Sequence, residues 1–329
     1  MSRTLRRRTL LALALAAGVP AAPRRLHAQG TWPDRPVRII VPFPPGQAAD
    51  TVTRIVADAL SSRWPQRVVV ENRGGGAGAP ALEAGARAAP DGYTLTAGTS
   101  GTLGVNPSVL PRLPYDAEKD FAPITNVAVV PLLLIAHPSF QGDVRAFVAQ
   151  ARARPGELNV ASAGPATSQH LATELLAHQL GLRLNIVHYR GSGPAIADLI
   201  AGNIPLMMDS VASALGNIRG GRVRALAVCT PRRLPWLPEV PSFAEAVAPG
   251  YEAAGWTGLV APAATPAEIV RKVNADAVAV LRDPDIARRL EEQAVLPDPR
   301  TPEEFAAFIR AEIAKWREVA RIANVKLEG

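Results

Sequence analysis

The chain has 329 residues, 48% of them hydrophobic, and a formal net charge of +7. The first 28 residues contain six arginines and no acidic residue, so the rest of the chain has 30 basic and 29 acidic residues and a net charge of +1. This balance lacks the basic excess that is typical of nucleic-acid-binding proteins. The single cysteine, Cys229, excludes an intramolecular disulfide, and its apolar surroundings are typical of a core residue rather than a nucleophile. The remaining length of about 300 residues exceeds what one core usually holds, so two lobes are expected.

The amino-terminal segment 1–28 has the pattern of a signal peptide. Arginines precede an apolar run at 10–19, and the segment ends in the small residue Ala28, after which we expect cleavage. The apolar run is half of the roughly 20 residues that a membrane-spanning helix needs. The pair Arg7 and Arg8 also fits a twin-arginine leader, so both a general secretory route and a twin-arginine route stay open. Either route predicts export to the periplasm.

From residue 37 onward, short β-rich apolar runs alternate with helical stretches. This pattern indicates an α/β fold with a parallel sheet covered on both faces. Strands are predicted at 37–41, 68–71, 94–97, 132–136, 159–162, 186–189, 206–208 and 224–229. Helices are predicted at 50–63, 79–89, 143–154, 167–180, 194–201, 267–282 and 302–323. No linker marks a domain boundary, so we expect the chain to cross between lobes on ordered strands at 123–130 and 253–261.

Three loops, within residues 39–50, 94–102 and 159–170, each join a predicted strand to a helix start. Loops of this kind line the crevice where ligands bind in open α/β sheets. A helix start offers unpaired N–H groups and the positive end of the helix dipole, so it can hold an anion without lysine or arginine. Hydroxyl groups in the second and third loops add hydrogen-bond donors. The loops therefore predict a carboxylate ligand, although each loop alone also fits a tight turn with a Ser or Thr cap.

Two acidic residues lie near these loops. Asp50 follows the first loop at a helix start, where it can cap the helix, orient the loop or accept a hydrogen bond from a ligand amine. Asp209 ends a strand-like run, and the same alternatives apply to it.

Enzyme motifs are weak in this sequence. The Gly-x-Ser-x-Gly pattern of a nucleophile elbow does not occur, which leaves a serine hydrolase using Ser100 or Ser168 with His170 as a remote alternative. The glycine cluster at 74–78 lacks the endings of phosphate-binding and dinucleotide-binding loops. We therefore expect no catalytic residues and no cofactor.

A metal site is also not expected. His170, Glu174 and His178 share one predicted helical face, but the two histidines are about 12 Å apart along the helix, too far for one ion to reach both. His170 is instead predicted to cap the helix or line the cleft, and His178 to be exposed.

The stretch 32–46 resembles the opening of the tripartite tricarboxylate transporter substrate-binding proteins, also called the Bug family. Similar motifs follow in the family's order, and each is weak alone but specific as a set that covers essentially the whole mature chain. They are Val70-Glu-Asn-Arg73, Ala89-Pro-Asp-Gly-Tyr-Thr-Leu95, Gly98-Thr-Ser100, Asn106-Pro107, Leu113-Pro-Tyr-Asp116, Lys119-Asp-Phe-Ala-Pro123, Tyr189-Arg-Gly-Ser-Gly-Pro194 and Gly221-Arg-Val-Arg-Ala-Leu-Ala-Val228.

The resemblance implies a type II-like periplasmic binding protein with two lobes, each a mixed, mostly parallel sheet flanked by helices. We expect residues 29–129 and 254–329 to form one lobe and 130–253 the other, with the ligand cleft between them and hinge closure around the ligand. It also implies a monomeric, non-enzymatic receptor that captures a mono-, di- or tricarboxylate or an amino acid for a membrane transporter. A receptor of the same fold that signals ligand occupancy to a membrane partner stays open as an alternative.

The resemblance also implies which residues line the cleft. Taken over position by position, they are Phe43, Gly46, Gln47, Ala48, Asp50, Thr99, Ser100, Gly101, Asn106, Ser162, Gly164, Thr167, Ser168 and His170, with Tyr189 and Asp209 as weaker candidates. The sequence departs from the family pattern at Gln47 and Ala166, where the family usually has glycine. Both changes add side-chain bulk to loops that normally approach the ligand through bare backbone, so we expect a smaller or differently polar ligand.

Overall fold

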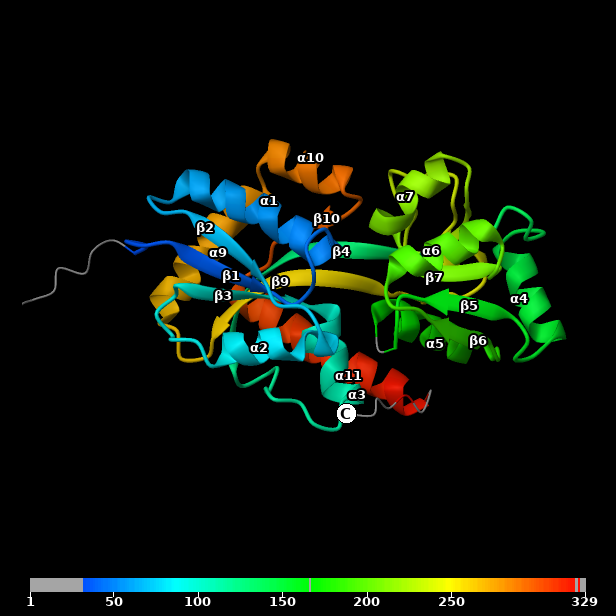
Figure 1. Cartoon of the computed structure of the whole chain (residues 1–329), viewed down its shortest axis with the longest axis horizontal. Coiled ribbons are helices and arrows are strands. Elements are labelled where there is room, and N and C mark those ends of the chain that lie inside the picture. Colours follow the sequence, from blue (N-terminus) through cyan, green and yellow to red (C-terminus); the bar gives the residue numbers. More distant parts are fainter. Residues whose placement is uncertain (1–31, 166, 323–324, 326–329) are drawn as a thin grey trace, which may run out of the picture. The chain divides into compact units, whose positions relative to one another are not determined.

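The computed structural model describes residues 32–165, 167–322 and 325, and within them an α/β fold built on a mixed sheet (Figure 1). The sheet order is β2-β1-β3-β9-β4-β7-β5-β6, with β8 and β10 also paired to β4. This confirms the predicted fold class. The predicted signal peptide, its cleavage after Ala28 and the departure at Ala166 lie outside the described residues.

The first half of the sheet is built from three parallel strands and two antiparallel partners. The parallel strands are β1 (Val37–Val41), β2 (Val68–Asn72) and β3 (Thr94–Thr99). Strand β9 (Ala254–Pro262) runs antiparallel to β3 and to β4 (Phe121–Ala136). Because β1 and β3 are parallel neighbours, the loops that follow them leave the same edge of the sheet.

The second half of the sheet is built from β5 (Asn159–Ser162), β6 (Asn185–His188) and β7 (Leu206–Ser210), which are parallel, and from β8 (Arg224–Val228). Both β7 and β8 run antiparallel to β4. All eight strands predicted from the sequence are present, within a few residues at their ends except for β4.

Strand β4 belongs to both halves of the sheet. Its first part pairs with β9 from Phe121 to Pro131, and its last part pairs with β7 and β8 from Leu132 to Ala136. Both predicted crossing segments are therefore strands, but the first is the front half of a 16-residue strand rather than a separate connection.

The helices complete the fold. They are α1 (Ala48–Arg63), α2 (Ala79–Ala86), α3 (Asn106–Val109), α4 (Val144–Ala153), α5 (Ser168–Leu180), α6 (Ser192–Ala201), α7 (Val211–Arg219), α8 (Phe243–Ala246), α9 (Ala267–Leu281), α10 (Pro284–Glu292) and α11 (Pro302–Ile322). Two further segments are a 3-10 turn at Gly76–Gly78 and a π-helix at Ser100–Val105, and a short strand β10 (Leu296–Pro297) pairs with β4. No helix among the described residues is long and apolar enough to span a bilayer.

The helices predicted at 267–282 and 302–323 have apolar residues at helical spacing, and most of these residues are buried. In α11, Phe305, Ile309, Ile313 and Trp316 are buried, whereas Phe308 is half-buried. In α9 the buried face starts at Val270, because Ile269 remains half-buried.

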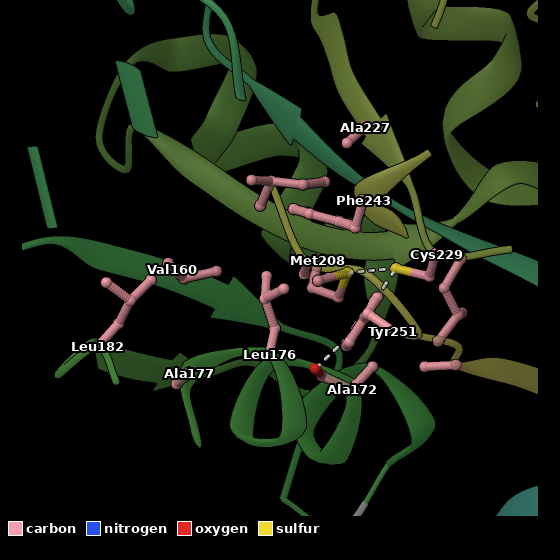
Figure 2. Packing of buried hydrophobic residues seen from close by; sticks show 14 of the residues in the cluster. Val160, Ala172, Leu176, Ala177, Leu182, Met208, Ala227, Cys229, Phe243 and Tyr251 are labelled. Carbon is pink, nitrogen blue, oxygen red and sulfur yellow. Dashed lines mark hydrogen bonds between the residues drawn. The ribbon is translucent and has the colours of Figure 1, made fainter. Parts of the chain in front are cut away.

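Cys229 lies inside a buried cluster, which confirms its prediction as a core residue (Figure 2). Its Sγ lies 3.4 Å from Sδ of Met208, and Oη of Tyr251 donates a 2.8 Å hydrogen bond to the carbonyl oxygen of Ala172. Burial raises the pKa of the Cys229 thiol to about 12, so the reactive thiolate is absent at neutral pH.

The same cluster extends across the sequence boundaries predicted for the two lobes. Val105 and Trp316, from the ranges predicted as one lobe, pack with Leu132 and Phe147 from the other. The division at 129/130 and 253/254 stays a prediction.

Candidate functional site

The three predicted loops follow β1, β3 and β5 and lead into α1, the π-helix at Ser100–Val105 and α5. Gly78, of the glycine cluster, lies between the first two loops, since a Cβ built on it would come 2.9 Å from Cβ of Pro42 and 2.7 Å from Cγ2 of Thr102. Helix α5 contacts both the π-helix and β9. The structure therefore brings all three loops to one region.

The first loop is held by the carboxylate of Asp50. The backbone of Gly46 has a φ of +84°, a conformation that favours glycine, and its N–H donates a 2.8 Å hydrogen bond to Oδ2 of Asp50. Asp50 is buried and also accepts hydrogen bonds from Arg54 and Asn72. Although burial opposes ionisation, these donors together lower the pKa of Asp50. Of the roles open to Asp50, orienting the loop is the one that these contacts serve.

The start of α1 has no side-chain cap. Gln47 is the N-cap residue, with an extended backbone and an exposed side chain that makes no capping hydrogen bond. The N–H groups of Ala48 and Ala49 donate no hydrogen bond to the described part of the chain. These amides and the positive end of the helix dipole form a suitable anion site. Phe43 is half-buried at the front of the same loop, where its carbonyl oxygen accepts a bond from Asn72.

In the second loop, the hydroxyl groups serve mainly to cap the π-helix. The N–H of Thr102 donates to Oγ1 of Thr99, and the N–H of Thr99 donates to Oγ1 of Thr102, at 3.2 and 2.9 Å. Asn106 is buried and donates from Nδ2 to the carbonyl oxygen of Ala77 at 2.9 Å. Ser100 is buried and Gly101 is half-buried at the helix start. The polar groups of Thr99 and Asn106 are thus used within the protein.

In the third loop, Thr167 caps α5. Its Oγ1 accepts a 3.2 Å hydrogen bond from the N–H of His170 and donates a 2.8 Å bond to the carbonyl oxygen of Gly164. Gly164 has a φ of +142°, and a Cβ built on it would lie 3.2 Å from the carbonyl oxygen of Tyr189. Ser168 lies beside β9, with Oγ 3.5 Å from the position of a Cβ on Gly255. The third loop is therefore tightly fitted, and Ser168 contacts β9.

Behind the third loop, two histidines lie together. The rings of His170 and His188 meet edge to face at 4.4 Å, and Nδ1 of His188 lies 2.8 Å from Oγ of Ser162. Burial and the neighbouring His170 lower the pKa of His188, which favours its neutral form. Nε2 of His170 lies 3.5 Å from Oε1 of Glu174, whereas His178 is exposed, as predicted. The described residues include no cluster of three or more His, Cys, Asp or Glu that could hold a metal ion.

The weaker candidates, Tyr189 and Asp209, both contact α6. Oη of Tyr189 donates a 2.8 Å hydrogen bond to Oδ2 of Asp198, so this hydroxyl is used within the protein. Asp209 is fully buried at the end of β7 and accepts a 2.6 Å hydrogen bond from Oγ of Ser192. Burial raises the pKa of Asp209 to about 7, since the hydrogen bond from Ser192 only partly offsets the cost of removing the charge from water.

Sequence reasoning missed several residues that hold the site together. Asn72 and Arg54 bind Asp50, Ser192 binds Asp209, and His188 contacts Ser162. Asn72 and Ser192 do lie inside two of the family motifs, Val70-Glu-Asn-Arg73 and Tyr189-Arg-Gly-Ser-Gly-Pro194. The pattern marks the segment but does not show which partner each side chain finds.

The start of α6 is a further uncapped helix start beside this region. Its N-cap residue, Gly191, has a φ of +119° and cannot provide a side-chain cap. A surface cavity of about 580 Å³ lies elsewhere, lined among others by Tyr115, Asp116, Glu118 and Arg317, and contains no residue of the three loops.

Comparisons with known proteins support one assignment. Residues 52–325 match the family model described as "Tripartite tricarboxylate transporter family receptor". The UPF0065 protein in the tcbD-tcbE intergenic region of Pseudomonas sp. (strain P51) is 39% identical over 317 residues, covering 95% of this chain and 93% of the relative. Protein BugT of Bordetella pertussis is 36% identical over 300 residues, covering 91% of this chain and 92% of the relative.

Solved structures agree with these relatives. The R. palustris protein Rpa4515 with adipate has a TM-score of 0.83 at 35% identity, covering 90% of this chain and 99% of that one. MatC (Rpa3494) from Rhodopseudomonas palustris with bound malate has a TM-score of 0.77 at 34% identity, covering 88% of this chain and 99% of that one. These relatives are substrate-binding proteins rather than enzymes, which removes the serine hydrolase alternative. The chain therefore belongs to the family of tripartite tricarboxylate transporter receptors, as its motif order predicts.

Proposed function

We propose that this receptor captures a small aliphatic dicarboxylate in the periplasm and delivers it to the membrane subunits of its transporter. The observation that carries the proposal is the uncapped start of α1, where the amides of Ala48 and Ala49 are open to an anion. Two relatives at 34 and 35% identity are named with malate and adipate, and both ligands are dicarboxylates.

Groups from all three loops are proposed to contact the ligand. One carboxylate binds the amides of Ala48 and Ala49, and the hydroxyl group of Ser100 supplies a further donor from the second loop. The hydroxyl group of Ser168 donates a long 3.2 Å hydrogen bond to Oε1 of the neighbouring Gln169, and on this proposal it exchanges that bond for one to the ligand. Thr99, Thr167 and Asn106 act one layer back, because their polar groups already bond within the protein. On this proposal Ser168→Ala lowers affinity directly, and Thr167→Ala lowers it through the start of α5.

A thermal-shift screen followed by calorimetry tests the ligand class. Malate, adipate, a monocarboxylate, a tricarboxylate and an acidic amino acid are compared with adipamide, which has the shape of adipate without its charges. We expect the dicarboxylates to raise the melting temperature and adipamide to leave it unchanged, because helix starts favour anions. Stabilisation by none of the acids, or equal stabilisation by adipamide, contradicts the proposal.

The transport role needs an experiment in cells. Uptake of the labelled ligand is compared in cells with and without the receptor. Loss of uptake supports delivery to a transporter, whereas unchanged uptake with a lost transcriptional response supports the sensing alternative.

Closure between two lobes is part of this proposal. With residues 29–129 and 254–329 as one lobe and 130–253 as the other, ligand binding is expected to make the protein more compact by hinge closure. Small-angle scattering with and without the ligand that passes the screen measures this change. An unchanged radius of gyration argues for a cleft that is already closed.

The route to the periplasm and the oligomeric state complete the proposal. We propose that the leader is removed after Ala28 and that the mature receptor is a monomer. Intact-mass analysis of the periplasmic fraction gives the cleavage site, and native mass spectrometry gives the state and any retained metabolite. Blocking the twin-arginine pathway separates the two export routes.

A further inference from the structure

The contacts of the first loop point to a residue outside the loop that controls it. Asn72 is the last residue of β2, and its side-chain amide reaches two partners at once. Nδ2 of Asn72 donates to the carbonyl oxygen of Phe43 at 2.9 Å and to Oδ1 of Asp50 at 2.8 Å. A single side chain therefore joins the front of the loop to the residue that holds its end.

We propose that Asn72 is a positioning residue that, together with Asp50, fixes the loop 42–47 so that the amides of Ala48 and Ala49 point to the ligand. This inference rests on the proposed binding function for the role of those amides. It assigns Asp50 to the support of the loop and not to contact with a ligand amine.

The hydrogen bonds of Asp50 exhaust its capacity. Oδ2 accepts the N–H of Gly46 at 2.8 Å and Nε of Arg54 at 3.1 Å, while Oδ1 accepts Nδ2 of Asn72 at 2.8 Å and the same Nε at 2.9 Å, which fills the acceptor positions of the carboxylate. With only 3% of its side chain exposed, Asp50 has no free face for a ligand. The N–H of Gly46 is likewise occupied, so it does not donate to a bound anion. The first free donors of the segment are those of Ala48 and Ala49.

Arg54 supports Asp50 and Asn72 in two ways. It offsets the negative charge of Asp50 at the start of α1, where an uncompensated carboxylate weakens the attraction of the helix dipole for an anion. Arg54 also donates from Nη2 to Oδ1 of Asn72 at 2.8 Å, which orients the side-chain amide so that Nδ2 faces Asp50 and Phe43. The three side chains form a closed ring of hydrogen bonds that contacts the loop at the N–H of Gly46 and the carbonyl oxygen of Phe43.

The neighbouring residue on β2 provides a matched control. Glu71 pairs with Arg38 at 2.9 Å and with Arg73 at 2.6 Å, and it makes no hydrogen bond to the loop. Glu71→Gln weakens two ion pairs on the same strand without touching the loop. Asn72→Ala removes both bonds that hold the loop.

The test measures hydrogen exchange of ligand-free protein over residues 42–50 and affinity for adipate. We expect Asn72→Ala to speed exchange of the Gly46 amide about tenfold and to weaken adipate binding about tenfold, as the loss of one or two hydrogen bonds predicts. Glu71→Gln is expected to change neither. A thermal melt of each variant confirms that the fold is retained, and Asn72→Gln, which keeps the amide on a longer stem, is expected to recover part of both effects.

The two arms separate this inference from the proposed function. The exchange arm needs no ligand, so unchanged exchange in Asn72→Ala overturns the inference whether or not the wild type binds a carboxylate. Faster exchange with unchanged affinity for adipate also overturns it, because the loop then has no effect on binding. A wild type that binds no acid in the screen counts against the proposed function alone. Faster exchange in Asn72→Ala then still supports the role of Asn72 in fixing the loop 42–47.

Discussion

Ser192 donates a 2.6 Å hydrogen bond from its hydroxyl group to the carboxyl group of Asp209, which is completely buried at the end of β7. No ion pair of the described residues involves Asp209, so its charged form has only hydrogen bonds to support it. Burial therefore raises its pKa from 3.8 to about 7. This places one buried titration in the pH range that a periplasmic protein meets.

The first prediction concerns Asp209 and pH. Because the folded state keeps Asp209 protonated up to about pH 7 while the unfolded chain ionises near 3.8, the stabilising effect is complete below about pH 4 and lost as pH rises to 7. Asp209→Asn keeps the shape and cannot ionise, so it should gain up to about 4 kcal/mol relative to the wild type between pH 4 and pH 7. Urea unfolding at several pH values measures the difference.

The difference in stability between the wild type and Asp209→Asn at each pH cancels the contributions of all other titrating groups, because both proteins contain them. His188 acts in the opposite sense, since its lowered pKa makes stability fall as pH drops, but this effect is common to both proteins. Ser192→Ala should raise the pKa of Asp209 further, because it removes a donor to the charged form. Parallel pH profiles of the wild type and Asp209→Asn would show that Asp209 is ionised in the folded state.

The second prediction concerns Glu312, which joins β9 to α11. Its Oε2 accepts hydrogen bonds from Nε1 of Trp256 and of Trp316, at 3.0 and 2.9 Å. Glu312→Ala leaves two buried indole N–H groups without an acceptor, so we expect a loss of about 2 to 4 kcal/mol in the free energy of unfolding. Glu312→Gln keeps one acceptor oxygen and should lose less.

Denaturant unfolding followed by tryptophan fluorescence measures this loss. Glu318→Ala is the control on the same helix, because it removes an exposed ion pair with Arg321 and should cost less than about 1 kcal/mol. Equal losses in the two alanine variants would mean that the buried bonds to Glu312 add nothing.

The sequence predicts the regular part of the fold well because its signals are local. The strands at 37–41 and 159–162 are short runs with β-branched residues, helix α1 has apolar residues at helical spacing, and the structural bounds of all three agree with the predicted ones to within two residues. Strand β4 is harder, since Pro123 and Pro131 interrupt the pattern and its register with β9 shifts twice. Only its pairing with distant segments, β9 up to Pro131 and β7 and β8 beyond it, shows that it is one strand.

Helix α7 was missed for a related reason. Its nine residues include Gly216 and Asn217, which are weak helix formers, and it is held by its cap, in which Oγ of Ser210 accepts the N–H of Ser213. The same limit applies to the site. A threonine in a loop can bind a ligand or cap a helix, and only the observed bonds of Thr99 and Thr167 show that both act as caps.

The third prediction concerns Gly258, in the part of β9 that pairs with β3 and β4. A Cβ built on this residue would overlap the ring of Phe305, which is buried in the core below. Gly258→Ala should therefore destabilise the protein by about 1 to 3 kcal/mol through overpacking. Gly216→Ala is the matched control, because its Cβ meets open space within a helix and should stabilise by about 0.5 to 1 kcal/mol. Thermal melts of both variants test this prediction. A lower melting temperature in both variants would assign the loss to the backbone change rather than to packing against Phe305.

The last prediction concerns Gln47, where the family usually has glycine. The φ of Gln47 is −76°, so the backbone does not need glycine here, and the exposed side chain makes no capping bond. Its removal should therefore change stability by less than about 1 kcal/mol. Gln47 directly precedes Ala48 and Ala49, whose amides are proposed to bind the ligand, so Gln47→Gly should widen the range of acids that bind toward larger ones. The carboxylate screen measures this as a change in the order of melting-temperature shifts.

The control variant Gln47→Ala separates the effect of side-chain bulk from that of backbone flexibility, since it removes the bulk of Gln47 without adding the flexibility of glycine. A shift in preference shared by both variants assigns the effect to bulk, whereas an unchanged order in both means that this side chain does not select the ligand.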